Sequence, residues 1–249
     1  MSLRGPGPLL LALLCGCGTG SVKVDDGDAF GKVRSGLWLD MESSTAASHS
    51  FVLLDAKGAC ADAQDMFPAT AAAEAELVLK LEPLLDDPAS QCTVYEAHYK
   101  ELADLTDPLF GEGLHVLNLT LRDPVDAAED APPDGVYERF DVEKTGDNPY
   151  FLGRVTYYDS NPYRIFADYF DCSGAFQEDL DAATEAAVHS WSFADGEAEA
   201  ELAKSGESYK ISVSGGLEDI DGKSGGSASA KGTFDRCPIT YEGDTFVTL

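Results

Sequence analysis

The strongest constraint on the fold is a series of short segments, between residues 135 and 237, in which apolar and polar side chains alternate. This period-two alternation is typical of β-strands with one buried face, because successive side chains point to opposite sides of a strand. The segments follow one another at roughly ten-residue spacing with polar turns between them, which is typical of antiparallel sheets. We therefore predict a mainly β, α+β protein built on an antiparallel β-sandwich or open barrel.

Individual strands are predicted at 36–44, 50–55, 113–123, 135–143, 150–159, 163–171, 187–194, 197–203, 208–214 and 227–237. Asp195-Gly196 predicts a two-residue hairpin between two of these strands, since this pair suits the left-handed turn that hairpins use. Ser160-Asn161-Pro162 predicts a turn between two others. The second half of the chain is therefore expected to be almost entirely β.

Helical segments are expected mainly in one insert, near 61–105. Residues 69–81 follow Pro68 and are rich in helix-forming residues, and residues 94–105 place apolar side chains on one stripe. A shorter acidic helix is expected at 177–187. The insert would cap one end or one face of the sheet.

The charge balance excludes one large class of partner. The chain has 17 Lys and Arg against 45 Asp and Glu, which gives a formal net charge of −28. Such a surface repels phosphate backbones, so nucleic acid is not expected to bind. Apolar residues make up 44% of the 249 residues, enough for a folded domain with a real core.

The amino-terminal segment has the layout of a secretory signal. Arg4 is the only charged residue before Lys23, and a short apolar run, Leu9–Leu14, follows it. This run is far shorter than the roughly 20 residues that a transmembrane helix needs. Leu14-Cys15-Gly16-Cys17 resembles the lipobox of bacterial lipoproteins, in which Leu, any residue and a small residue precede a Cys.

That resemblance implies a lipid anchor and a location. Residues 1–16 would be removed as a signal peptide, and Cys17 would carry the diacylglycerol and an acylated amine, including a palmitate-type chain. Residues 17–28 would form an acylated tether to a single β-rich domain at 29–249. Gly18, rather than Asp, follows the modified Cys, so the resemblance points to the outer membrane, with the lipid bilayer as the first partner.

Four cysteines remain in the mature chain once Cys15 and Cys17 are set aside: Cys60, Cys92, Cys172 and Cys237. An even number in an exported chain predicts two disulfide bonds, formed in an oxidising compartment. Three pairings are possible. We favour Cys60–Cys92 and Cys172–Cys237, because each bridge then stays within one half of the chain.

The one candidate ligand site consists of aromatic and charged residues in the 155–170 region. Its candidate residues are Tyr157, Tyr163, Arg164, Asp168 and Tyr169. Open to solvent, such tyrosines with Arg and Asp would stack on and hydrogen-bond a sugar or a peptide. The alternative is that these aromatic residues simply fill the core of the sheet.

No metal or cofactor is expected. Residues 217–224 resemble part of a calcium loop, but the EF-hand template requires Glu six residues after Gly222, where this chain has Ala228. A flexible turn between strands is the simpler interpretation. The four histidines are scattered, and phosphate-binding, dinucleotide-binding and nucleophile-elbow motifs are missing from the sequence.

The overall layout is also similar to a loose group of uncharacterised β-rich envelope lipoproteins, through residues Gly232-Thr233-Phe234-Asp235-Arg236-Cys237 near the end. This motif carries no catalytic residues. We therefore expect a non-enzymatic cell-envelope lipoprotein with a binding or structural role, whose partner is an envelope protein or a glycan. The alternative is a carbohydrate-active or peptidoglycan hydrolase on a β-sandwich.

The lipid anchor can be tested with one substitution. Cys17→Ala removes the thiol that would carry the diacylglycerol, so the protein should lose the mass of its acyl chains and move from the membrane to the soluble fraction. Mass spectrometry and fractionation measure both effects. A variant with the same fractionation as the wild type, and no loss of acyl mass, would show that Cys17 is not the anchor.

Overall fold

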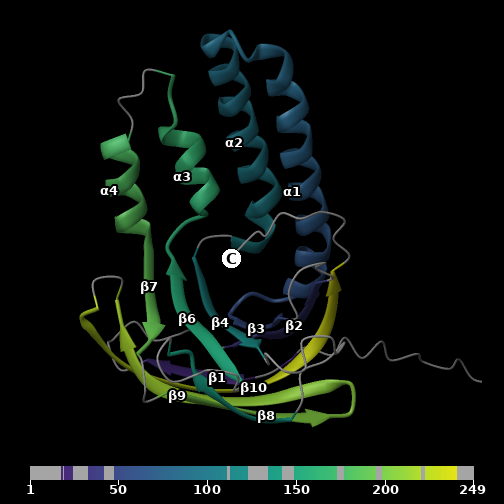
Figure 1. Ribbon diagram of the computed structural model, residues 1–249, viewed down its shortest axis with the longest axis vertical. Helices are drawn as coiled ribbons and strands as arrows, with labels where there is room; N and C mark the ends of the chain where they lie inside the picture. The colour runs from purple at the N-terminus through teal and green to yellow at the C-terminus, as the bar shows by residue number, and fades with distance from the viewer. Residues whose placement is uncertain are drawn as a thin grey trace, which may run out of the picture.

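The computed structural model describes residues 18, 20–24, 33–41, 48–110, 113–122, 134–141, 149–172, 177–194, 198–219 and 222–239 (Figure 1). Its strands are β1 (Gly20–Val24), β2 (Ser35–Met41), β3 (Ser48–Leu54), β4 (Leu114–Arg122), β5 (Gly135–Arg139), β6 (Tyr150–Tyr158), β7 (Val188–Phe193), β8 (Glu199–Ser205), β9 (Ser208–Glu218) and β10 (Ser224–Ile239). Its helices are α1 (Ala59–Leu81), the short 3-10 helix η1 (Glu82–Leu84), α2 (Pro88–Phe110), α3 (Pro162–Tyr169) and α4 (Gln177–Ala187). The predicted α+β class and the helical insert are confirmed.

The ten strands form one mostly antiparallel sheet that curls back on itself. The strand order is β1-β10-β2-β3-β4-β6-β5-β8-β9-β7, and two further pairings, β10–β9 and β6–β7, bring its ends together. The result is ring-like without being a regular barrel. In Figure 1, β8, β9 and β10 form the lower layer, and the helices stand above the opposite side of the molecule.

Apolar side chains from both layers fill the space that the sheet encloses. Its aromatic members include Phe51, Phe151, Phe193 and Phe234, all almost fully buried. The rings of Phe51 and Phe234 meet edge to face with their centres 5.5 Å apart, an arrangement that aromatic pairs prefer. The core therefore explains the alternation seen in the sequence, because one face of every strand contributes to it.

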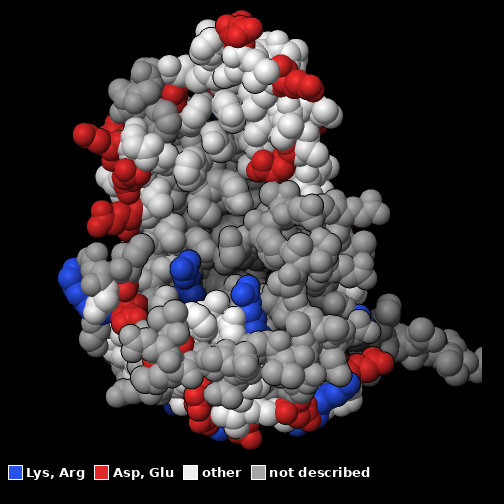
Figure 2. Space-filling view, in the orientation of Figure 1, with Lys and Arg blue, Asp and Glu red and all other residues white. Residues whose placement is uncertain are grey.

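A second apolar cluster joins α1 and α2 to the outside of β2, β3, β4 and β10. Helix α1 begins at Ala59, ten residues earlier than predicted, and continues through Pro68. The buried side chains Ala59, Ala63, Met66 and Phe67 explain the earlier start, since they follow the helical period onto the sheet. Figure 2 shows that acidic side chains are spread over this helical half of the molecule.

The predicted strand at 163–171 is wrong, because Pro162–Tyr169 form helix α3. Asn161 caps this helix: its Oδ1 accepts a hydrogen bond from the backbone N–H of Tyr163 at 3.0 Å, and Pro162 occupies the first turn. An Asn-Pro pair starts a turn or a helix equally well. Here the buried contacts of Asn161 with α2 favour the helix.

The predicted hairpin at Asp195-Gly196 is also wrong, although these two residues lie outside the described ranges. Strands β7 and β8 both run antiparallel to β9, so they point the same way and cannot form a hairpin. Phe193 of β7 pairs with Leu217 of β9, and Glu199 of β8 pairs with Ser214, three residues earlier on β9. The two strands therefore follow one another along β9. The other predicted strands lie within about four residues of their expected bounds.

The structure contains two disulfide bonds, as predicted, but the favoured pairing of the four cysteines is wrong. The bonds are Cys60–Cys237 and Cys92–Cys172. Cys60 and Cys92 are the second and fifth residues of their helices, α1 and α2, which pack as an antiparallel pair. Two 23-residue helices are about 34 Å long, so these cysteines lie at opposite ends of the pair. One bond instead joins α1 to β10, and the other joins α2 to the chain just after α3.

The predicted tether at 17–28 is wrong over Gly20–Val24, which form β1 and pair antiparallel with β10. Val22 is 7% exposed and belongs to the main core. Gly18 is buried as well, and a Cβ there would lie 2.3 Å from the carbonyl oxygens of Gly36 and Thr233. The folded sheet therefore begins within three residues of Cys17.

Gly153 provides a test of how tightly the main core is packed. A Cβ at this position would lie 2.5 Å from Cδ2 of Phe193 and 3.0 Å from atoms of Leu119 and Phe151. Gly153→Ala should therefore lower the free energy of unfolding by about 1–3 kcal/mol, measured by chemical denaturation. The matched control is Gly135→Ala on β5, where a Cβ meets nothing within 4 Å. Equal effects of the two substitutions would contradict this packing.

Candidate functional site

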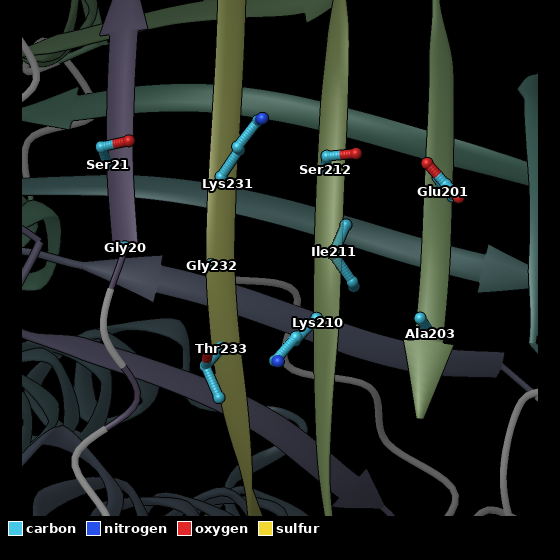
Figure 3. Close-up of a pocket in the computed structure, with 10 residues that line it drawn as sticks. All are labelled: Gly20, Ser21, Glu201, Ala203, Lys210, Ile211, Ser212, Lys231, Gly232 and Thr233. Carbon is cyan, nitrogen blue, oxygen red and sulfur yellow. The ribbon is translucent and has the colours of Figure 1, made fainter. Parts of the chain in front are cut away.

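A groove of about 640 Å³ crosses the face that β1, β10, β9 and β8 turn away from the main core (Figure 3). The strand register arranges its side chains in rows across the four strands. One row holds Ser21, Lys231, Ser212 and Glu201, each paired with the next. The row beside it holds Thr233, Lys210 and Ala203. The floor of the groove is therefore made of small side chains, with lysines and a glutamate standing above it.

Alternation along the strands places these polar residues on the outside. Ile211, Val213 and Ala230 point inward and are only 3–4% exposed. Their neighbours Ser212 and Lys231 must then point outward. The same side chains that build the core on one face thus fix the positions of the hydroxyl and ammonium groups on the other.

Three lysines lie on a diagonal across three adjacent strands. Lys23 of β1 pairs with Ser229, two residues before Lys231 on β10, and Lys210 of β9 pairs with Thr233, two residues after Lys231. Diagonal neighbours in a sheet have Cβ atoms about 7–8 Å apart. All three lysines are exposed. In Figure 3 the side chains of Lys210 and Lys231 lean into the strip between β9 and β10.

The acidic residues that line the groove and its adjoining hollow lie on β8. Glu201 and Glu199 lie on the outer face of β8, and Glu199 also lines an adjoining hollow of about 380 Å³ with Lys23. Ser212 separates Lys231 from Glu201 within their row. The groove therefore has a cationic side over β1, β10 and β9 and an anionic edge along β8.

This arrangement suits a ligand with both acidic and hydroxyl groups. Ammonium groups donate up to three hydrogen bonds and attract carboxylate, sulfate or phosphate oxygens. Serine and threonine hydroxyls both donate and accept, and an exposed carboxylate such as Glu201 accepts from a hydroxyl. In a chain of net charge −28 with 17 basic residues, three exposed lysines on one diagonal are a local exception.

The sequence did not predict this groove, although it contained one of the signals. The segments 208–214 and 227–237 alternate, and most of their outward residues are Lys, Ser and Thr, with Asp235 as an acidic exception. What the sequence does not contain is the register that aligns Lys23, Lys231 and Lys210, since β1 was expected to be a tether. Lys23 lies beside Lys231 and Lys210 because β1 pairs with β10.

The structure separates the residues of the predicted aromatic site. Tyr157 lies on β6, whereas Tyr163, Arg164, Asp168 and Tyr169 lie on helix α3. The Tyr157 ring stacks on His115 of β4 with centres 4.3 Å apart, and its hydroxyl donates to Asp159 at 2.9 Å. His115 in turn contacts Asp55 through Nδ1 at 2.8 Å. Tyr157 therefore belongs to a cross-strand aromatic row, not to a shared surface with α3.

Arg164 ties α3 to α2. Its guanidinium Nη2 donates to Asp104 at 2.8 Å and also to Asp107. Burial acts to raise the pKa of Asp107, but hydrogen bonds from Asn161 and Arg164 outweigh it and hold that pKa below its ordinary value. Arg164 therefore has a structural role in this fold.

The three remaining residues of that predicted site point in different directions on α3. Tyr163 is half-buried, and burial, reinforced by the charge of Glu74, raises its pKa. Asp168 is exposed, and Tyr169 is 44% exposed. A strand would have placed Tyr163 and Tyr169 on one face. In a helix, residues six apart point in directions about 120° apart around the helix axis.

The acidic loop at 217–224 forms a turn over the residues that the structure describes. The Asp219 carboxylate accepts a hydrogen bond from the Lys223 backbone N–H at 2.8 Å, and the Gly222 N–H donates to the Asp219 carbonyl at 3.0 Å. Within the described ranges, no three His, Cys, Asp or Glu side chains are grouped so that they could hold a metal ion. Asp219 thus closes a turn here.

The lipobox residues, including Cys17, lie outside the described residues. Among the helices that are described, none is both long and apolar enough to cross a membrane.

Comparison with known proteins identifies no relatives. No protein-family model matches the chain, and no curated protein or solved structure matches it either.

Proposed function

We propose that this chain is an exported, disulfide-braced lipoprotein of the cell envelope that binds an acidic glycan in the groove over β1, β10, β9 and β8. The observation that carries the proposal is the diagonal of Lys23, Lys231 and Lys210: Lys210 and Lys231 line the groove, and Lys23 lines the adjoining hollow. The two disulfide bonds support export, because such bonds persist in oxidising compartments. The resemblance to a lipobox at Cys17 supports the anchor.

The spacing of the lysines favours a linear ligand. Three lysines in one line, on diagonal neighbours about 7–8 Å apart, can each reach an acidic group along a linear chain that carries several of them. Ser21, Ser212 and Thr233 lie beside this line and would hydrogen-bond sugar hydroxyls. Uronic-acid polymers combine both kinds of group.

The acidic edge of the groove favours one orientation. Glu199 and Glu201 repel an anionic chain from β8, so the ligand would follow the lysine diagonal over β1, β10 and β9. A sugar hydroxyl that reaches toward β8 would still donate to Glu201. The same two carboxylates should disfavour polyanions that have no hydroxyl groups, because such ligands cannot donate a hydrogen bond to Glu201.

We favour binding over the hydrolytic alternative because of where the carboxylates lie. Glycoside hydrolases place two carboxylic groups on opposite sides of the scissile bond. Here Glu199 and Glu201 stand on the same face of one strand, both exposed to solvent. This geometry suits contact with the edge of a ligand.

The proposal predicts a charge-dependent affinity for uronic-acid oligomers. The soluble domain should bind oligogalacturonate, measured by calorimetry at low salt, and should not bind neutral dextran. The double substitution Lys210→Gln with Lys231→Gln should weaken binding about two- to thirtyfold, because each of the two exposed ion pairs contributes roughly 0.2–1 kcal/mol. Added salt should reduce the affinity of the wild type and abolish most of this difference.

The control is the double substitution Lys57→Gln with Lys204→Gln, which removes the same charge from two exposed lysines that do not line the groove. Its affinity should equal that of the wild type within twofold. Equal weakening by the two double variants, or equal binding of dextran, would refute a glycan site in this groove.

A further inference from the structure

Another hollow, lined by none of the groove residues, lies between helices α2, α3 and α4. Its volume is about 530 Å³, within the range of small-molecule sites. Tyr99 from α2, Phe166 and Phe170 from α3 and its end, and Leu180 from α4 form its apolar lining. The glycan proposal does not use any of these residues.

The aromatic lining is a packed cluster rather than a set of separate rings. The centre of the Tyr99 ring lies 5.0 Å from that of Phe170 and 5.5 Å from that of Phe166. Tyr95, one turn earlier on α2, stacks on Tyr99 at 6.4 Å. Phe166 nevertheless remains 37% exposed. A large aromatic ring that stays open to solvent at a hollow is available to a ligand.

The opposite wall of the hollow is acidic. Asp181 and Glu185, four residues apart on α4, both line it and are exposed. Gln177 donates to the Asp181 carboxylate at 2.7 Å and so holds it in place. Acidic side chains are visible along α4 in Figure 2. Two carboxylates therefore face a hollow whose floor is made of aromatic rings.

The neighbouring basic residues do not neutralise this wall. The sequence of α4 contains no Lys or Arg. The one lysine of α2, Lys100, pairs with Glu96 at 2.7 Å, and the one arginine of α3, Arg164, pairs with Asp104 and Asp107. Within the described helices α2, α3 and α4, no Lys or Arg is therefore left to balance Asp181 and Glu185.

We propose that this hollow binds a small organic cation, an ammonium or guanidinium group on an apolar body. Aromatic faces attract cations because their ring quadrupole is negative above the plane, and carboxylates attract the same charge. The apolar body would cover Phe166 and Leu180. An anionic ligand is repelled by α4, and a neutral apolar ligand would cover the carboxylates without satisfying them.

Covalent and hydrogen-bonded contacts preorganise the hollow for a ligand. The Cys92–Cys172 disulfide joins the amino-terminal part of α2 to the chain after α3. Asn161, only 3% exposed, donates through Nδ2 to the carbonyl of Ala103 at 3.1 Å and to Thr106 Oγ1 at 2.9 Å. These contacts fix the positions of Phe166 and Phe170 against Tyr99, which lowers the ordering cost of binding.

The test is a calorimetric titration of the disulfide-bonded protein with 2-phenylethylammonium at low salt. Its neutral analogue 2-phenylethanol and its anionic analogue phenylacetate are the comparison ligands. The ammonium should bind at least tenfold more tightly than the alcohol, and phenylacetate should give no measurable heat. Glu185→Gln should weaken ammonium binding about three- to tenfold, and Phe166→Leu should do so by a similar factor, since a cation–π contact is lost.

The matched control is Glu178→Gln, which removes the same charge from the same helix at a residue that does not line the hollow. Thermal unfolding of each variant checks that the fold is retained, and Glu185 is exposed, so its substitution should not affect folding. Three results would each overturn the proposal: no heat with the ammonium at millimolar concentration, equal affinity for the alcohol, or equal effects of Glu178→Gln and Glu185→Gln. The lysine variants of the glycan test should leave ammonium binding unchanged, so the two proposals fail separately.

Discussion

The pairing of β10 with three other strands is the interaction on which the rest of the structure depends. This 16-residue strand pairs with β9 from Ser224 to Phe234, with β1 from Ala228 to Gly232, and with β2 from Asp235 to Ile239. It therefore joins the two layers of the curled sheet. The disulfide between Cys237 and Cys60 also attaches helix α1 to it. Loss of β10 would open the ring, release β1 and remove the Cys60–Cys237 link to α1.

The same strand connects the core to the proposed glycan site. Ala228, Ala230 and Phe234 point into the main core, while Lys231 and Thr233 point into the groove. Gly232 has no room for a side chain, because a Cβ would lie 2.7 Å from the Leu53 side chain. The register of β1 on β10, in which Gly20 pairs with Gly232 and Lys23 with Ser229, aligns Lys23 with the other two lysines. Packing inside the sheet thus sets the charge pattern outside it.

The sequence predicted the parts of the fold that depend on local periodicity, and it missed those that depend on long-range register. Alternation located β9 and most other strands, because each buries one face in the same core. Asn161-Pro162 was misinterpreted because the same pair suits a turn and a helix start, and only contacts with α2 decide between them. The Cys60–Cys237 disulfide joins residues 177 apart in the chain, the lysine diagonal joins residues 208 apart, and no local pattern encodes such distances. Tyr157 is separated from the other residues of the predicted site because these lie on helix α3 and not on a strand.

The central claim is that acidic glycan binds along the lysine diagonal, and lysine NMR tests it most directly. Reductive methylation with ¹³C-formaldehyde labels each lysine and keeps its positive charge. On titration with oligogalacturonate, the signals of Lys23, Lys210 and Lys231 should shift together, with one affinity, while those of Lys57 and Lys204 stay in place. Equal shifts at all five lysines, or shifts that leave out the three on the diagonal, would contradict the account.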